Sequence, residues 1–104
     1  MTKEITDSNY QEYLNDPKLI VLRYTAQWCS PCRAIAPIFD KLSEKYSDNV
    51  IMGKVDVDEN PNLSIEYGIT NIPAVLFIKN GKVLEKLVGA NTNSTYVKKI
   101  ESYL

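Results

Sequence analysis

The chain contains two cysteines, and they lie close together in the segment Trp28-Cys29-Ser30-Pro31-Cys32. A strand-like apolar run precedes this segment and a helix-like pattern follows it, so a helix is expected to begin beside the first sulfur. The unpaired N–H groups and the positive dipole end of such a helix favour the thiolate form of Cys29. The thiolate is the attacking species in disulfide exchange. The pattern therefore predicts a redox dithiol in which Cys29 attacks and Cys32 resolves the mixed disulfide.

Two other interpretations of the cysteine pair are a structural disulfide and part of a metal site. A bridge that closes so short a loop constrains the unfolded chain only slightly, so it adds little stability. The chain has no histidine and no third cysteine, so a tetrahedral zinc site would need carboxylates or a second subunit. Both interpretations are weaker than redox chemistry, and no metal is expected.

Composition limits the possible partners. The 104 residues are expected to form one domain, 1–104, with a single core, and the net charge is −1 with both signs interspersed. This pattern resembles neither a nucleic-acid footprint nor a polybasic membrane patch. No apolar signal core or membrane-spanning run is present in the sequence. We therefore expect a cytoplasmic monomer, and in that compartment structural disulfides are rare.

Strand-like and helix-like segments alternate along the chain. Unbroken apolar runs predict strands at 19–22 and 74–78, and further strands are expected at 50–57 and at 83–88, the latter as the partner of 74–78. Apolar residues at helical spacing predict helices at 10–14, 31–46, 60–68 and 97–104, the first capped by Asp7 or Ser8 and the second kinked at Pro37. Asn80-Gly81 predicts a tight hairpin. This order predicts a central sheet with parallel pairs, helices on both faces and an antiparallel hairpin at one side.

With the motif and this order in place, the chain resembles the thioredoxin family over nearly its whole length. The matching landmarks are Trp28-Cys29-x-Pro31-Cys32, Pro37, Lys54, Asp58, Asn60-Pro61, Tyr67-Gly68-Ile69, Ile72-Pro73, Lys79-Asn80-Gly81 and Val88-Gly89-Ala90. The resemblance implies a three-layer α/β/α fold, with a central mixed sheet of about five strands flanked by four helices. It also implies a general protein disulfide reductase with no bound cofactor. Its partners would be proteins with disulfides and a thioredoxin reductase, usually an NADPH-dependent flavoenzyme, that restores the dithiol.

The resemblance also implies a substrate-binding surface around the dithiol. Pro73 would follow a cis peptide bond, and the backbone of Ile72 would pair with an extended substrate segment. The residues implied for this surface are Trp28, Ile72, Pro73, Val88, Gly89 and Ala90. Ordinary packing is the alternative for each of them, and for Gly89 a bulge.

Ser30 is the first of two departures from the family pattern, because a glycine is usual between the cysteines. Its hydroxyl group could donate a hydrogen bond to a sulfur and favour the thiolate. The alternative is a tolerated substitution in a loop.

Arg23 is the second departure, because it stands where the family usually carries a buried aspartate. Arginine stays protonated and cannot accept a proton from Cys32. Burying the charges of both Arg23 and Lys54 without an acid would cost free energy, so one of the two side chains should reach solvent or an acid. Asp56 is a candidate partner of Lys54. A cation near Cys32 would favour its thiolate and make the protein more oxidising. The alternative is that Arg23 points to solvent on a strand edge.

Three other functions are alternatives to the reductase. A glutaredoxin would usually carry a tyrosine between the cysteines, and a disulfide isomerase or oxidase would carry a histidine there and an export signal. The third alternative is a thioredoxin-like binding subunit without redox turnover. Both cysteines are present, and a pure scaffold does not need them. The sequence therefore favours the reductase.

Overall fold

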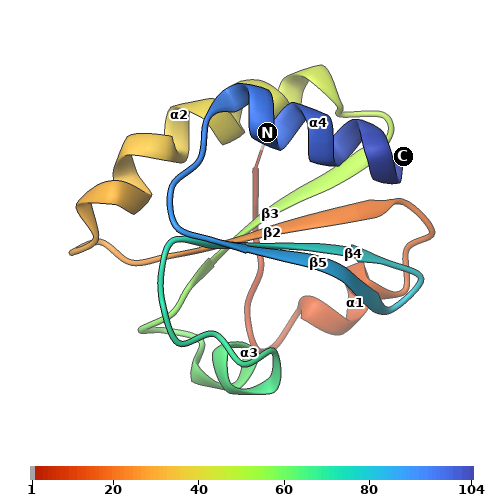
Figure 1. Ribbon diagram of the computed structural model, residues 1–104. Coiled ribbons are helices and arrows are strands. Elements are labelled where there is room, and N and C mark those ends of the chain that lie inside the picture. The colour runs from red at the N-terminus through yellow and green to blue at the C-terminus, as the bar shows by residue number, and fades with distance from the viewer. Residues whose placement is uncertain (1) are drawn as a thin grey trace.

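The computed structural model describes residues 2–104 and shows a five-stranded mixed sheet between two layers of helices (Figure 1). The strands are β1 (Lys3–Glu4), β2 (Leu19–Thr25), β3 (Val50–Asp56), β4 (Ala74–Lys79) and β5 (Lys82–Val88). The helices are α1 (Tyr10–Leu14), α2 (Ser30–Lys45), α3 (Pro61–Glu66) and α4 (Asn93–Tyr103). The predicted three-layer α/β/α fold is confirmed.

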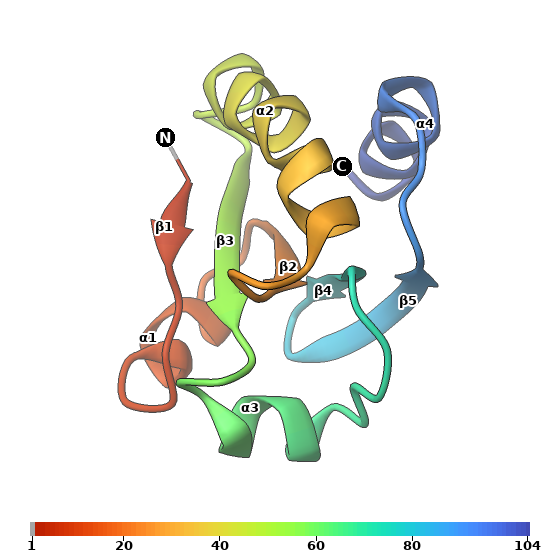
Figure 2. The same cartoon turned by 90° about the vertical axis from the view of Figure 1, so that its left-hand side faces the viewer.

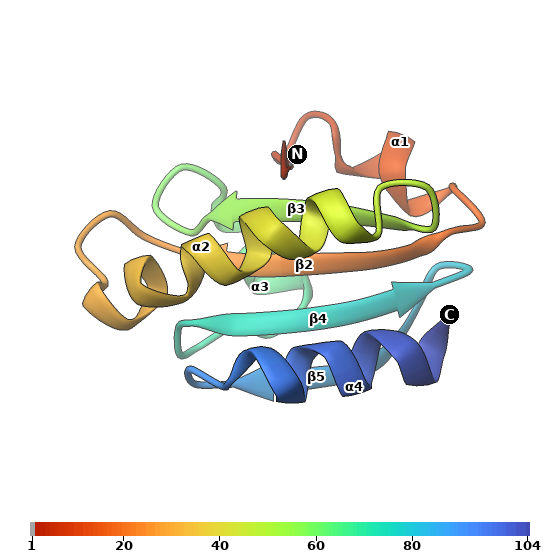
Figure 3. The ribbon, with the colours of Figure 1, turned by 90° about the horizontal axis from the view of Figure 1, so that it is seen from above.

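The strand order in the sheet is β1-β3-β2-β4-β5. β3 is parallel to both β1 and β2, whereas β4 is antiparallel to both β2 and β5. Helices α2 and α4 cover one face, with α2 lying over β2 and β3 and α4 lying nearer β5 (Figure 3). Helices α1 and α3 cover the other face (Figure 1). β2 is therefore a central strand covered on both faces, which explains its unbroken apolar run.

Each face of the sheet packs its own core. Between α2, α4 and the sheet, Phe39 of α2 and Tyr96 of α4 are buried with their ring centroids 4.7 Å apart. On the opposite face, Tyr24 of β2 and Leu63 of α3 are buried in a second cluster. Gly53 on β3 is required by close packing, because a Cβ atom there would collide with the side chain of Ile5.

Most predicted elements are present, and their ends differ by a few residues. β2 continues past its predicted end at residue 22 to Thr25, whereas β3 ends at Asp56 and leaves Val57 outside. α2 runs through Pro37 without a break. Asn80 and Gly81 both have positive φ angles, +53° and +77°, and form the predicted hairpin turn. None of the helices in residues 2–104 is long and apolar enough to cross a membrane.

The predicted cap of the first helix is wrong. α1 begins after Asn9, not after Asp7 or Ser8. The Asp7 carboxylate instead accepts hydrogen bonds from the backbone N–H groups of Asn62 (3.2 Å) and Leu63 (2.9 Å). Asp7 therefore caps α3, which is distant in sequence, and no local pattern could indicate this.

The two chain ends also differ from the prediction. β1 was not predicted, because it has only two residues and both are charged. At the other end, the last helix is predicted at 97–104, but α4 spans Asn93–Tyr103 and Leu104 is 46% exposed. Tyr96 and Ile100 are the residues of α4 that are buried.

Candidate active site

Cys29 and Cys32 form a disulfide at the start of α2, with their Cα atoms 5.3 Å apart. Cys29 is the N-cap of the helix, and its Sγ accepts a hydrogen bond from the backbone N–H of Cys32 at 3.3 Å. Pro31 lies in the first turn, where a missing N–H group costs no helical hydrogen bond. The helix therefore directs an unpaired N–H group at the first sulfur, as the sequence predicts.

The two cysteines differ in their access to solvent. Cys29 is 4% exposed and Cys32 is fully buried, and both pack against Ala26. Val57 and Ile72 pack against the same cluster. Cys29 is nearly buried, because these apolar side chains surround the disulfide. It is the residue of the pair that keeps some solvent-accessible area.

Trp28 lies at the surface beside the disulfide, with 67% of its area exposed. Its indole Nε1 donates a hydrogen bond to Oδ2 of Asp58 at 2.8 Å. Asp58 follows β3 in the turn that leads to α3. This contact ties the large apolar ring to a second loop and fixes its position without burying it.

Pro73 follows a cis peptide bond with Ile72, as the family resemblance implies. Pro73 is buried, and its carbonyl accepts a hydrogen bond from the backbone N–H of Gly89 at 2.8 Å. Gly89 has a φ of +91°, a conformation that favours glycine. The neighbouring Val88 and Ala90 are exposed. Figure 2 views the end of the molecule where the loops before α2 and β4 come together.

Ser30 forms a contact that the sequence analysis did not foresee. Its Oγ accepts a hydrogen bond from Nη2 of Arg33 at 3.2 Å, and Nη1 of Arg33 donates to the carbonyl of Gln27. No hydrogen bond from the Ser30 hydroxyl to a sulfur is found in residues 2–104. Arg33 thus joins the loop before Cys29 to the first turn after it. The three-residue spacing from Ser30, which places both on one helix face, was the available signal.

Arg23 is buried in the central strand, so the interpretation that it points to solvent on a strand edge is wrong. The side chain is 4% exposed, and its guanidinium carbon lies 5.5 Å from the centroid of the Phe39 ring. Burial lowers the pKa of the guanidinium group. In the described part of the chain, Arg23 Nε is the only buried side-chain nitrogen or oxygen without a hydrogen-bond partner.

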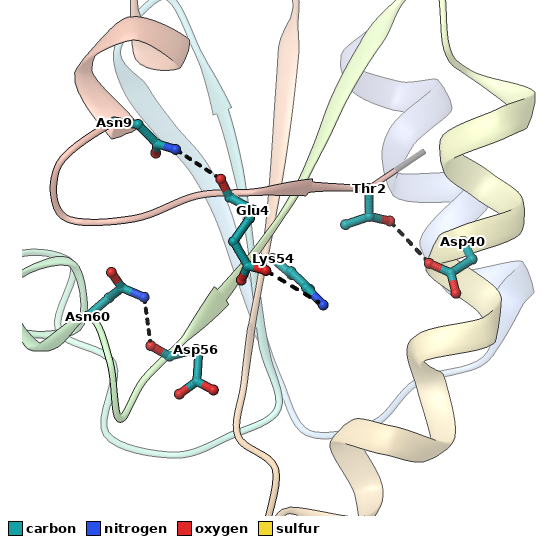
Figure 4. A network of polar contacts seen from close by, with 7 residues as sticks. All are labelled: Thr2, Glu4, Asn9, Asp40, Lys54, Asp56 and Asn60. Carbon is teal, nitrogen blue, oxygen red and sulfur yellow. Dashed lines mark hydrogen bonds and ion pairs between the residues drawn. The ribbon is translucent and has the colours of Figure 1, made fainter.

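Lys54 finds an acid, as expected, but the acid is not Asp56. Its Nζ lies 3.9 Å from Oε1 of Glu4 on the neighbouring strand β1 (Figure 4). Oδ1 of Asp56 accepts hydrogen bonds from the backbone N–H groups of Asp58 and Glu59. Asp56 therefore organises the turn after β3. Because β1 was not predicted, the sequence did not place Glu4 beside Lys54, and Asp56 was the candidate partner instead.

The Cys29–Cys32 pair is sufficient for thiol-disulfide exchange. Within residues 2–104, no group of three or more His, Cys, Asp or Glu residues could hold a metal ion. A cysteine pair can carry two electrons as a disulfide or a dithiol, and it needs no further group for this.

The chain is similar to known proteins along nearly its full length. A family model described as Thioredoxin matches residues 1–102. A thioredoxin of Chlorobaculum thiosulfatiphilum is 40% identical over 102 residues, covering 97% of this chain and 94% of that protein. A thioredoxin of Synechocystis sp. is 38% identical over 104 residues, covering 99% and 97% of the two chains. Thioredoxin H4 of Arabidopsis thaliana is 49% identical over 81 residues, covering 78% and 68%.

These matches agree with the cysteine pair at the start of α2, the mixed sheet and the cis proline. Relatives named as thioredoxins support a protein-disulfide reductase that works without a bound cofactor. The chain is therefore a thiol-disulfide oxidoreductase and belongs to the thioredoxin family.

Proposed function

We propose that Cys29 is the attacking thiol of this reductase and that Cys32 is the resolving thiol. The observation that carries this assignment is their difference in exposure, 4% against 0%. A target disulfide approaches the pair from the side of Cys29, the residue that keeps solvent-accessible area. Cys29 is also the N-cap of α2, where a backbone N–H group already points at its sulfur. A negative charge on that sulfur is favoured by the helix end.

The reaction moves two electrons from the dithiol to the target. The Cys29 thiolate attacks one sulfur of the target disulfide, the target S–S bond breaks, and the first target thiolate leaves. The Cys32 thiolate then attacks the Cys29 sulfur of the mixed disulfide and releases the second target thiolate. Both target thiolates take up protons, and the protein is left with the Cys29–Cys32 disulfide.

The exposed residues around Cys29 are proposed as the substrate surface. Trp28 and Val88 expose 67% and 54% of their area, and Ile72 packs beside the disulfide. The Pro73–Gly89 hydrogen bond holds the loop before β4 against the loop after β5. An extended target segment could lie across the Ile72 backbone, with Gly89 and Ala90 at its side.

We propose Arg23 as a residue that tunes the disulfide. Arg23 and Ala26 line the same cleft, and Ala26 packs against both cysteines. Arg23 forms no ion pair in the described residues, and Asp40 and Glu4 act on it only at longer range, so its charge also acts on a thiolate on Cys32. This interaction stabilises the reduced form and makes the protein more oxidising than it would be with a neutral residue there.

The remaining partners follow from the family. We propose recycling by a thioredoxin reductase, an NADPH-dependent flavoenzyme, in the cytoplasm, with the protein acting as a monomer. The dithiol surface is one of several exposed apolar areas in residues 2–104. Ile65, Val83 and Leu84 are also exposed, on α3 and β5. Sedimentation analysis at increasing concentration tests the monomer.

The experiment that tests the assignment compares two single variants in the reduction of insulin disulfides by dithiothreitol. Both Cys29→Ser and Cys32→Ser should lose turnover. Only Cys32→Ser should accumulate a mixed disulfide with the target, because its attacking thiol remains. Accumulation in Cys29→Ser instead would reverse the roles. No turnover by the wild-type protein would favour the binding-subunit alternative.

A further inference from the structure

A cleft of about 310 Å³ lies between the start of α2 and the strands β2 and β3. This volume is at the lower end of the roughly 300–1,000 Å³ typical of small-molecule sites. Three cations, Arg23, Arg33 and Lys54, and three acids, Glu4, Asp56 and Glu59, line the cleft. Its formal charge is balanced, so the arrangement of the charges decides what it can bind.

The deepest charged group is Arg23, which is 4% exposed. One side of its guanidinium faces the Phe39 ring, and its Nε has no hydrogen-bond partner. The ion pairs in residues 2–104 are Lys54–Glu4 and Lys99–Glu85, and neither includes Arg23. Buried charges are usually paired, because an unpaired charge in a low dielectric is costly. The base of the cleft therefore carries a positive charge that forms no ion pair within residues 2–104, and Asp40 and Glu4 act on it only at longer range.

The acids lie nearer to solvent and are partly engaged. Glu4 pairs with Lys54, and Figure 4 shows the two side chains meeting beside β3. Asp56 accepts two backbone N–H groups, and Glu59 is exposed. Solvent screens charges at this rim more strongly than the charge at the bottom. The cleft thus has Arg23 at its base and both signs of charge around its mouth, where Arg33 and Lys54 lie with the three acids.

We propose that this cleft binds a small oxyanion against the terminal nitrogens of Arg23. A planar guanidinium group forms paired hydrogen bonds with carboxylate, sulfate or phosphate oxygens. Such an ion would supply the ion pair that Arg23 lacks within the described residues. The cleft measures only about 310 Å³, so the ligand is a compact ion. A metal cation is disfavoured, because it would meet the guanidinium at the base.

The test is a titration of the oxidised protein with inorganic phosphate, with ionic strength held constant by sodium chloride and binding followed by nitrogen-15 NMR. Saturable shifts are expected at the Arg23 side chain and at the amides of Ala26 and Ala36, which line the cleft. Parallel titrations with sulfate and acetate distinguish a tetrahedral from a planar oxyanion. No disulfide exchange is involved, so failure here would leave the reductase proposal intact.

Two variants separate this site from general charge effects. Arg23→Met should weaken phosphate binding by about tenfold or more, since charge-assisted hydrogen bonds are lost. Lys98→Met removes the same charge from an exposed position of α4 and should leave binding unchanged. Ala36→Leu fills the cleft while keeping Arg23, and it should also weaken binding. Shifts that do not saturate, or equal affinity in wild type and both cleft variants, would overturn the proposal.

Discussion

Arg23 and Tyr24 are neighbours on the central strand, and they face opposite sides of the sheet. Tyr24 is fully buried, and its hydroxyl donates a hydrogen bond to the carbonyl of Leu63 at 3.2 Å. Arg23 is almost as deeply buried but forms no ion pair within the described residues, and its Nε has no hydrogen-bond partner. The two side chains are thus similarly buried, but the hydroxyl of Tyr24 has a hydrogen-bond partner and Nε of Arg23 has none.

The difference in hydrogen bonding suggests different roles: the Tyr24 hydroxyl is structural, and the Arg23 guanidinium is functional. A buried hydroxyl with its hydrogen bond made contributes to stability and has no charge to act on its surroundings. A buried cation without a partner costs stability and projects its charge onto nearby groups. The disulfide lies on the side of that cation, where α2 begins. We therefore expect changes at Tyr24 to alter unfolding and changes at Arg23 to alter redox behaviour.

The largest expected effect is on stability, from truncating Tyr24. Tyr24→Ala removes a fully buried ring and should lower the free energy of unfolding by about 3–5 kcal/mol. Urea denaturation followed by circular dichroism measures this loss. A loss below about 1 kcal/mol would mean that this face of the sheet is not packed as described.

A smaller effect is expected from removing the Tyr24 hydroxyl alone. Tyr24→Phe keeps the ring but leaves the Leu63 carbonyl without its donor, at a cost of about 1–3 kcal/mol in the free energy of unfolding. The same denaturation experiment measures it. An unchanged midpoint would show that the carbonyl is satisfied in another way.

Tyr46 lies on the same face of the sheet as Arg23, but its polar group has a hydrogen-bond partner. Its hydroxyl donates to Oε2 of Glu101 at 2.6 Å, and this hydrogen bond raises the pKa of Tyr46 from 10.0 to about 12. The folded pKa is above the unfolded one, so the stabilisation is complete below pH 10 and is lost as pH rises toward 12. The stability difference between wild type and Tyr46→Phe should shrink across this window. A difference that is constant with pH would contradict the assignment.

The smallest effect is expected at Lys54, the partly exposed cation at the mouth of the cleft. Its pair with Glu4 is long, 3.9 Å, and its side chain is 43% exposed. Lys54→Met should change the free energy of unfolding by less than about 1 kcal/mol, and added salt should reduce the difference further. A larger change in the free energy of unfolding, or one that does not depend on salt, would mean that Lys54 behaves as a buried charge, as Arg23 does.

The sequence predicted the layers, the hairpin and the cysteine pair because these depend on local patterns. Apolar runs, helical spacing and Asn80-Gly81 each act over a few residues. The roles of Asp7 and Glu4 could not be predicted, because each contacts a segment about fifty residues away. The burial of Arg23 was predicted only as one of two alternatives, since strand order decides whether a strand is central or at an edge.

The most direct test of the functional difference between Arg23 and Tyr24 is the thiol-disulfide equilibrium of Cys29 and Cys32 with glutathione. We predict that Arg23→Met shifts this equilibrium about tenfold toward the disulfide, equivalent to about 30 mV more reducing, because the thiolate loses a nearby cation. Its free energy of unfolding should be unchanged or higher. Tyr24→Phe should keep the wild-type equilibrium. An unchanged equilibrium in Arg23→Met, or an equal shift in both variants, would contradict the account.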